Sequence, residues 1–69
     1  MNLLEHYVKE VKEVTDITAD FKEKSGYTPK EPLYEITMEI DCMGVEECVK
    51  EQFFETEWKT IKERGYYLA

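Results

Sequence analysis

At 69 residues, with 42% hydrophobic residues and nine aromatic side chains, the chain suffices for one small core and a single domain, residues 1–69. The formal net charge of −7 disfavours direct binding to nucleic acid or to an anionic membrane, because both are polyanions. The sequence has neither a run of about 18 apolar residues nor a signal-peptide pattern. We therefore expect a cytoplasmic protein.

The N-terminal segment, residues 3–24, is compatible with either a helix or a strand. Val8, Val11 and Val14 recur at the three-residue spacing of a helix face, whereas the β-branched and aromatic residues here favour a strand. Because an isolated two-stranded hairpin is marginal in water, we favour a third strand over Tyr7–Thr15. Asp16 then caps a short helical turn, and a proline-containing loop follows Gly26.

Residues 34–42 alternate without error between apolar and polar side chains. Tyr34, Ile36, Met38, Ile40 and Cys42 fall on one side of the pattern, and the acidic side chains fall on the other. Successive side chains of a β-strand point to opposite faces, so the pattern predicts a strand with one apolar and one carboxylate-rich face.

The next residues predict a hairpin. Met43-Gly44 supplies the positive φ that a tight turn requires, and residues 45–54 form the returning strand. Its alternation is imperfect, which a bulge or longer turn near Glu46-Glu47 would repair. Cys42 and Cys48 can face each other near the end of this hairpin, but in a reducing compartment we expect two thiols.

The C-terminal residues predict a short helix followed by an extended tail. Thr56 is the expected N-cap, and Trp58 and Ile61 share one helix face. Gly65 is placed to end the helix, and residues 66–68 then pack against the sheet. The predicted fold class is α+β: a small antiparallel sheet of about three strands with the C-terminal helix on its apolar face.

The negative charge is concentrated in the middle of the chain. Residues 31–57 carry nine acids against one base, Lys50, whereas residues 1–30 carry six acids and five bases. Solubility does not require such clustering, and like charges on neighbouring strands repel one another. We therefore predict that the hairpin carries a partner-binding surface, formed by Glu35, Glu39, Asp41, Glu46, Glu47 and Glu51.

The residue types needed for catalysis are sparse. Glu39 and Asp41 would lie about 6.6 Å apart on a strand, near the separation of an inverting glycosidase pair, but a flat face has no apolar wall to raise a carboxyl pKa. His6 is the only histidine, and Cys42 and Cys48 match no zinc or redox spacing. We expect no enzyme, no catalytic residues, no metal site and no cofactor.

Residues 33–68 resemble a group of proteins. The order of a strand, an Asp-Cys-Met-Gly turn, a second strand and a short helix ending in Gly-Tyr is similar to short proteins of phages and prophages of Gram-positive bacteria. More loosely, a small acidic phage-type protein resembles inhibitors of host defence, including anti-CRISPR and DNA-mimic proteins. This second likeness is one of size and charge, and it implies action inside the host cell.

These observations predict a non-enzymatic inhibitor. Its acidic hairpin would occupy the basic groove of a host protein that handles nucleic acid or acts in CRISPR-Cas-like defence. The alternative is a structural or assembly protein that forms a homodimer through a sheet edge, with its acidity serving solubility.

Overall fold

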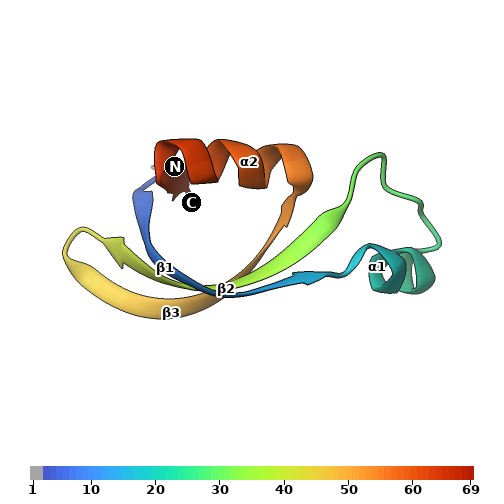
Figure 1. Ribbon diagram of the computed structural model, residues 1–69, viewed down its shortest axis with the longest axis horizontal. Coiled ribbons are helices and arrows are strands. Elements are labelled where there is room, and N and C mark those ends of the chain that lie inside the picture. The colour runs from blue at the N-terminus through green and yellow to red at the C-terminus, as the bar shows by residue number, and fades with distance from the viewer. Residues whose placement is uncertain (1–2) are drawn as a thin grey trace.

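The computed structural model describes residues 3–69, which form one curled antiparallel sheet and two helices (Figure 1). The sheet has four strands in the spatial order β3-β2-β1-β4. In chain order, the elements are β1 (Glu5–Asp16), α1 (Thr18–Ser25), β2 (Leu33–Cys42), β3 (Val45–Phe54), α2 (Glu55–Arg64) and β4 (Tyr66–Leu68). Helix α2 lies over the concave side of the sheet, whereas α1 lies beyond its far end (Figure 1).

The concave side, which we call the inner face, carries the core. Ile36, Met38 and Ile40 of β2 are at most 1% exposed, as the alternation in this strand predicts. Phe53, Trp58, Ile61 and Tyr67 complete the buried cluster from β3, α2 and β4. Full burial of one such aliphatic side chain contributes about 1.5–3 kcal/mol, so β2 supplies much of the stability of a domain this small.

Strand β1 keeps its three valines on the inner face by means of two bulges. The pairing with β2 shifts register between Val8 and Glu10 and again between Val11 and Glu13. Each shift adds one lysine, Lys9 or Lys12, so that two residues of β1 oppose one of β2. The expected strand at residues 7–15 is thereby confirmed, and the three-residue spacing of the valines reflects bulges rather than a helix.

The hairpin between β2 and β3 is tight and regular. Met43 and Gly44 both have positive φ, 53° and 86°, as a type I′ turn requires. The register then runs without interruption from Cys42↔Val45 to Leu33↔Phe54. The bulge expected near Glu46-Glu47 was therefore wrong. The alternation looked imperfect because β3 places glutamates on the inner face, at its exposed edge.

Both helices begin and end with local hydrogen bonds. The Asp16 carboxylate accepts from the Thr18 amide and hydroxyl, at 2.9 and 2.6 Å, just before α1. These hydrogen bonds lower the pKa of Asp16. Helix α2 ends at Gly65, which has a φ of 87°. Thr56 was wrongly expected as its N-cap: α2 begins one residue earlier, and the Thr56 amide donates to Glu31 Oε1 at 2.7 Å.

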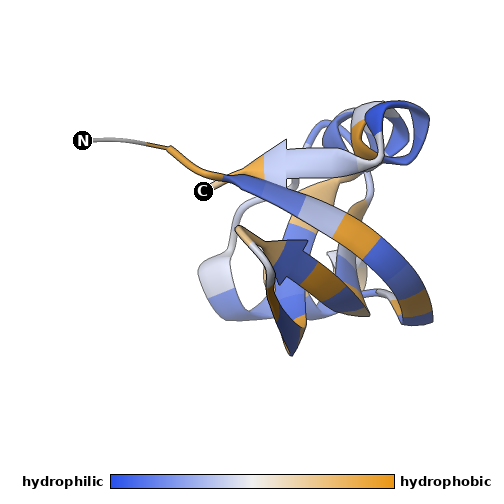
Figure 2. Cartoon of the chain, turned by 90° about the vertical axis from the view of Figure 1, so that its left-hand side faces the viewer, coloured by the Kyte–Doolittle hydropathy of each residue, from blue (hydrophilic) through white to orange (hydrophobic). Residues whose placement is uncertain are grey.

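The fold class is α+β, with more sheet than expected. The C-terminal tail forms a fourth strand, β4, which pairs with Glu5–Tyr7 of β1. Its two tyrosines point to opposite faces, so Tyr67 enters the core, whereas Tyr66 packs at a tilt against Tyr7 on the other side, with ring centroids 5.5 Å apart. Figure 2 shows hydrophobic and hydrophilic positions alternating along the strands, which is the pattern that gives the sheet two chemically different faces.

Candidate functional site

The convex side of the sheet, which we call the outer face, carries most of the predicted site. Residues that pair directly across an antiparallel sheet point to the same face. Glu35, Glu39 and Asp41 of β2 pair with Gln52, Cys48 and Glu46 of β3. Four of the six predicted residues therefore share this face, and we call them the acidic set: Glu35, Glu39, Asp41 and Glu46.

Glu47 and Glu51 do not belong to this set. They pair with Ile40 and Ile36, two core residues of the inner face. Their negative charge contributes, after burial itself, to raising the pKa of Tyr67 to about 12. A single acidic surface made of all six residues is therefore wrong. The sequence counted these glutamates as neighbours because it did not establish the register of β3.

Two residues of the acidic set have lysine partners within the chain. Lys12 Nζ lies 3.2 Å from Glu39 Oε1, and Lys50 Nζ lies 4.0 Å from Glu35 Oε1. The hydrogen bond to Glu39 raises the pKa of the Lys12 ammonium. Both lysine side chains are substantially exposed, at 45% and 62%. Exposed ion pairs contribute only about 0–1 kcal/mol, so a stronger cationic partner can displace these lysines.

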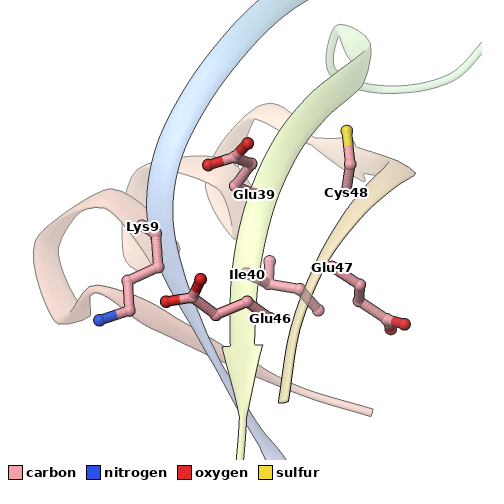
Figure 3. Close-up of a pocket in the computed structure, with 6 residues that line it drawn as sticks. All are labelled: Lys9, Glu39, Ile40, Glu46, Glu47 and Cys48. Carbon is pink, nitrogen blue, oxygen red and sulfur yellow. The ribbon is translucent and has the colours of Figure 1, made fainter. Parts of the chain in front are cut away.

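The other two acidic residues lie at the hairpin end. Asp41 Oδ1 accepts a hydrogen bond from the Gly44 amide at 2.8 Å, so this carboxylate also holds the turn. Glu46 is exposed and, within residues 3–69, makes no ion pair. Figure 3 shows Glu46 extending toward Lys9 across β2, while Glu47 points away on the other side of β3. These residues line a depression together with Glu39, Ile40 and Cys48.

The outer face also includes carboxylates from β1 that the sequence analysis did not predict. Glu10 pairs with Glu39, and Glu13 pairs with Thr37, so both acids extend the acidic set onto a third strand. The signal for them was the repeated triplet Lys-Glu-Val at residues 9–14. In a bulged strand this triplet places every valine inside and every glutamate outside.

The remaining chemically reactive side chains are dispersed. Cys42 pairs with Val45 on the inner face and Cys48 pairs with Glu39 on the outer face, so the expectation that they can face each other was wrong. His6 stacks on Tyr67, with ring centroids 5.1 Å apart, and its Nδ1 lies 2.9 Å from the Leu4 carbonyl oxygen. Across residues 3–69, no cluster of three or more His, Cys, Asp or Glu is arranged to hold a metal ion.

Comparison with protein-family models, curated proteins and solved structures found no significant match to this chain. Among the described helices, none is long and apolar enough to cross a membrane. The arrangement of the site is therefore the basis for considering function. It presents an exposed carboxylate-rich sheet face, with lysines at its margins and in the β1 bulges.

Proposed function

We propose that this protein is a non-enzymatic inhibitor that binds a basic protein surface through its outer face. The observation that carries the proposal is the alignment of Glu35, Glu39, Asp41 and Glu46 on two adjacent strands of that face. The preferred target is a host protein that handles nucleic acid, because its binding groove is lined with lysine and arginine. The further assignment to defence evasion rests on the phage-type resemblance alone and stays a prediction.

The spacing of the carboxylates supports this kind of target. Alternate residues of one strand lie about 6.6 Å apart, and neighbouring strands lie about 4.8 Å apart. The phosphates of one DNA strand follow one another at about 3.4 Å along the axis. Charges on β2 and β3 together, with Glu10 and Glu13 on β1, approach this density more closely than those of one strand.

The lysines of the outer face set a requirement for the partner. Lys12 and Lys50 must turn away from Glu39 and Glu35 before these carboxylates can bind an arginine or lysine of the target. Because arginine forms two parallel hydrogen bonds with a carboxylate, an arginine-lined groove competes better than a lysine-lined one. Binding is therefore expected to weaken steeply with salt and to prefer arginine-rich surfaces.

A charge-reversal experiment tests the proposal. The triple variant E35K/E39K/E46K reverses the charge of three members of the acidic set and leaves the fourth, Asp41, to hold the turn. Its matched control, E23K/E47K/E63K, changes the net charge equally at positions away from the outer face. Wild type and control should retain partners from a bacterial lysate at low salt and release them at high salt, whereas the triple variant should retain none of them.

The captured proteins then decide the mechanism. Each is mixed with double-stranded DNA and a rising concentration of the wild-type chain. Displacement of the DNA by wild type and control, but not by the triple variant, supports occupation of a basic groove. If the triple variant captures the same partners as wild type, the outer face is not the interface.

A further inference from the structure

One long edge of the sheet is only partly covered. Strand β4 and its flanking residues hydrogen-bond to β1 as far as Val8, whose amide donates to the Gly65 carbonyl at 2.9 Å. Beyond that point, Lys9–Asp16 pairs with β2 on one side, and no strand of residues 3–69 pairs with its other side. All eight of these residues are exposed, although the strand is interior in the order β3-β2-β1-β4.

An apolar groove runs beside this open edge. Val11 and Val14 lie on the inner face but remain 42% and 46% exposed. With Tyr34 of β2 and Trp58 of α2, they line a groove of about 590 Å³ between the sheet and the helix, and Lys59 and Lys62 form its rim. A strand added to the edge of β1 would place its inward side chains against these two valines.

We propose that the occupant of this edge is β1 of a second copy of the chain. Antiparallel pairing about a two-fold axis between residues 12 and 13 places Val11 opposite Val14 of the partner. It also places Lys12 opposite the partner's Glu13 and Glu10 opposite the partner's Thr15. By symmetry each of these pairs occurs twice, so two salt bridges flank the axis and four valines meet beneath the helices.

The bulges make this register self-consistent. Lys12 and Glu13 both point outward because of the second bulge, whereas Val11 and Val14 point inward. In the proposed register, the sequence of inward and outward positions over residues 10–15 is identical in the two antiparallel copies. A bulged edge mismatches a regular strand, since bulges disrupt edge pairing. The same irregularity therefore favours a second copy over an unrelated strand.

Three nearby registers fail on charge or on space. A two-fold axis at residue 12 places Lys12 opposite Lys12 of the partner, and an axis at residue 13 places Glu13 opposite Glu13 of the partner. Like charges therefore meet in both registers. An axis at Val11 matches the charges well, but it drives Val14, Thr15 and Asp16 of the partner into the places of Gly65, Tyr66 and Tyr67 along β1. The opposite edge of the sheet, β3, lacks an apolar seam. Pairing about Cys48 sets Glu46 against the partner's Lys50, but it also sets the inward-facing Glu47 against Val49, and pairing about Val49 sets Glu47 against Glu51.

This inference goes beyond the proposed function and requires no basic partner, although Lys12 also forms the ion pair with Glu39 of the acidic set. Because the valines of both copies share one side, the inner faces align and the two outer faces continue into one another. A dimer would thus present one extended acidic surface. Self-association can nevertheless fail while the single outer face still binds a basic partner, and the reverse also holds.

Sedimentation equilibrium of the full chain tests the pairing. The 8.2 kDa wild type should associate to twice that mass as its concentration rises to about 1 mM. K12E sets glutamates 12 and 13 against those of its partner, and E13K sets two lysines against two lysines. Each variant alone should weaken dimerisation at least about tenfold, while far-UV circular dichroism shows that both remain folded.

The decisive test is to mix the variants K12E and E13K. K12E and E13K are complementary at both positions, so an equimolar mixture should form a heterodimer and regain the mass lost by each alone. A mixture of K50E and E46K controls for general attraction, because these two variants carry the same net charges but have their changes on β3. Each of them alone should dimerise as wild type does. A wild type that is monomeric at about 1 mM, or a K12E–E13K mixture that fails to associate, overturns the proposal. Weakened dimerisation of K50E or E46K alone overturns it in favour of the β3 edge.

Discussion

Deletion of Lys12 should leave the fold intact, whereas deletion of Thr37 should abolish it. Both residues lie on the outer face of neighbouring strands. Without Lys12 the pairs Val11↔Met38 and Glu13↔Thr37 become consecutive, so the ladder becomes regular at this point and every other side chain keeps its face. Thr37 lies in the unbulged strand β2, where a one-residue slip sends one half of the strand to the wrong side.

The two deletions differ in expected cost by several kcal/mol. Removal of Lys12 loses an exposed ion pair with Glu39, which contributes about 0–1 kcal/mol. Removal of Thr37 turns either Ile36 or both Met38 and Ile40 out of the core, where these side chains are at most 1% exposed. Losing each large buried side chain costs about 2–5 kcal/mol. A domain of this length has only about 3–10 kcal/mol in total.

Urea unfolding followed by far-UV circular dichroism and by the fluorescence of Trp58 measures both costs. The substitution K12A removes the ion pair without shortening the chain, so the Lys12 deletion should match it to within about 1 kcal/mol. The Thr37 deletion should show no cooperative transition. Equal destabilisation by the two deletions, or loss of folding on deletion of Lys12, would refute the bulge as the reason for the valine spacing.

Three further predictions concern the core, the turn and a tyrosine. Met38→Ala should destabilise the protein by about 2–5 kcal/mol, since Met38 is fully buried; a shift in the urea midpoint equivalent to less than 1 kcal/mol contradicts this packing. Met43→Asn should stabilise by about 0.5–1 kcal/mol, because Met43 is 80% exposed and asparagine tolerates its positive φ better; differential scanning calorimetry should show a higher Tm, and a lower one speaks against the turn. The pKa of Tyr67 is raised to about 12 in the folded protein, so protonated Tyr67 contributes its full share of the free energy of unfolding below pH 10. That contribution is lost as the pH rises from 10 through 12. The urea midpoint should therefore fall between pH 9 and pH 11 more in wild type than in Tyr67→Phe, and parallel falls would contradict the raised pKa.

The elements that sequence reasoning predicted well are those with a strong local signal. The perfect alternation of β2 was sufficient to assign both of its faces, and Gly44 and Gly65 marked the turn and the helix end. The choice of a strand for β1 was also correct, although it depended on the needs of the sheet rather than on periodicity. Thr56 was mistaken for a cap because the tertiary contact with Glu31 was not visible locally.

The candidate site was predictable only in part. Glu35, Glu39 and Asp41 followed from alternation within one strand, whereas Glu46, Glu47 and Glu51 depended on the register of β3 against β2. A change of one residue in that register exchanges the two faces completely. The sequence therefore assigned six glutamates and aspartates to one surface, and the structure placed only four of them there.

By itself, the sequence determined the class of fold, the apolar face of β2 and the concentration of negative charge in the middle segment. These properties depend on local periodicity and composition, which act over a few residues. Only the tertiary structure decided which carboxylates share the outer face, that two lysines bulge out of β1, and that Tyr66–Leu68 covers the edge of β1 only at Glu5–Tyr7. Strand pairing joins residues distant in the chain, and its register is set by the packing of the whole sheet against α2.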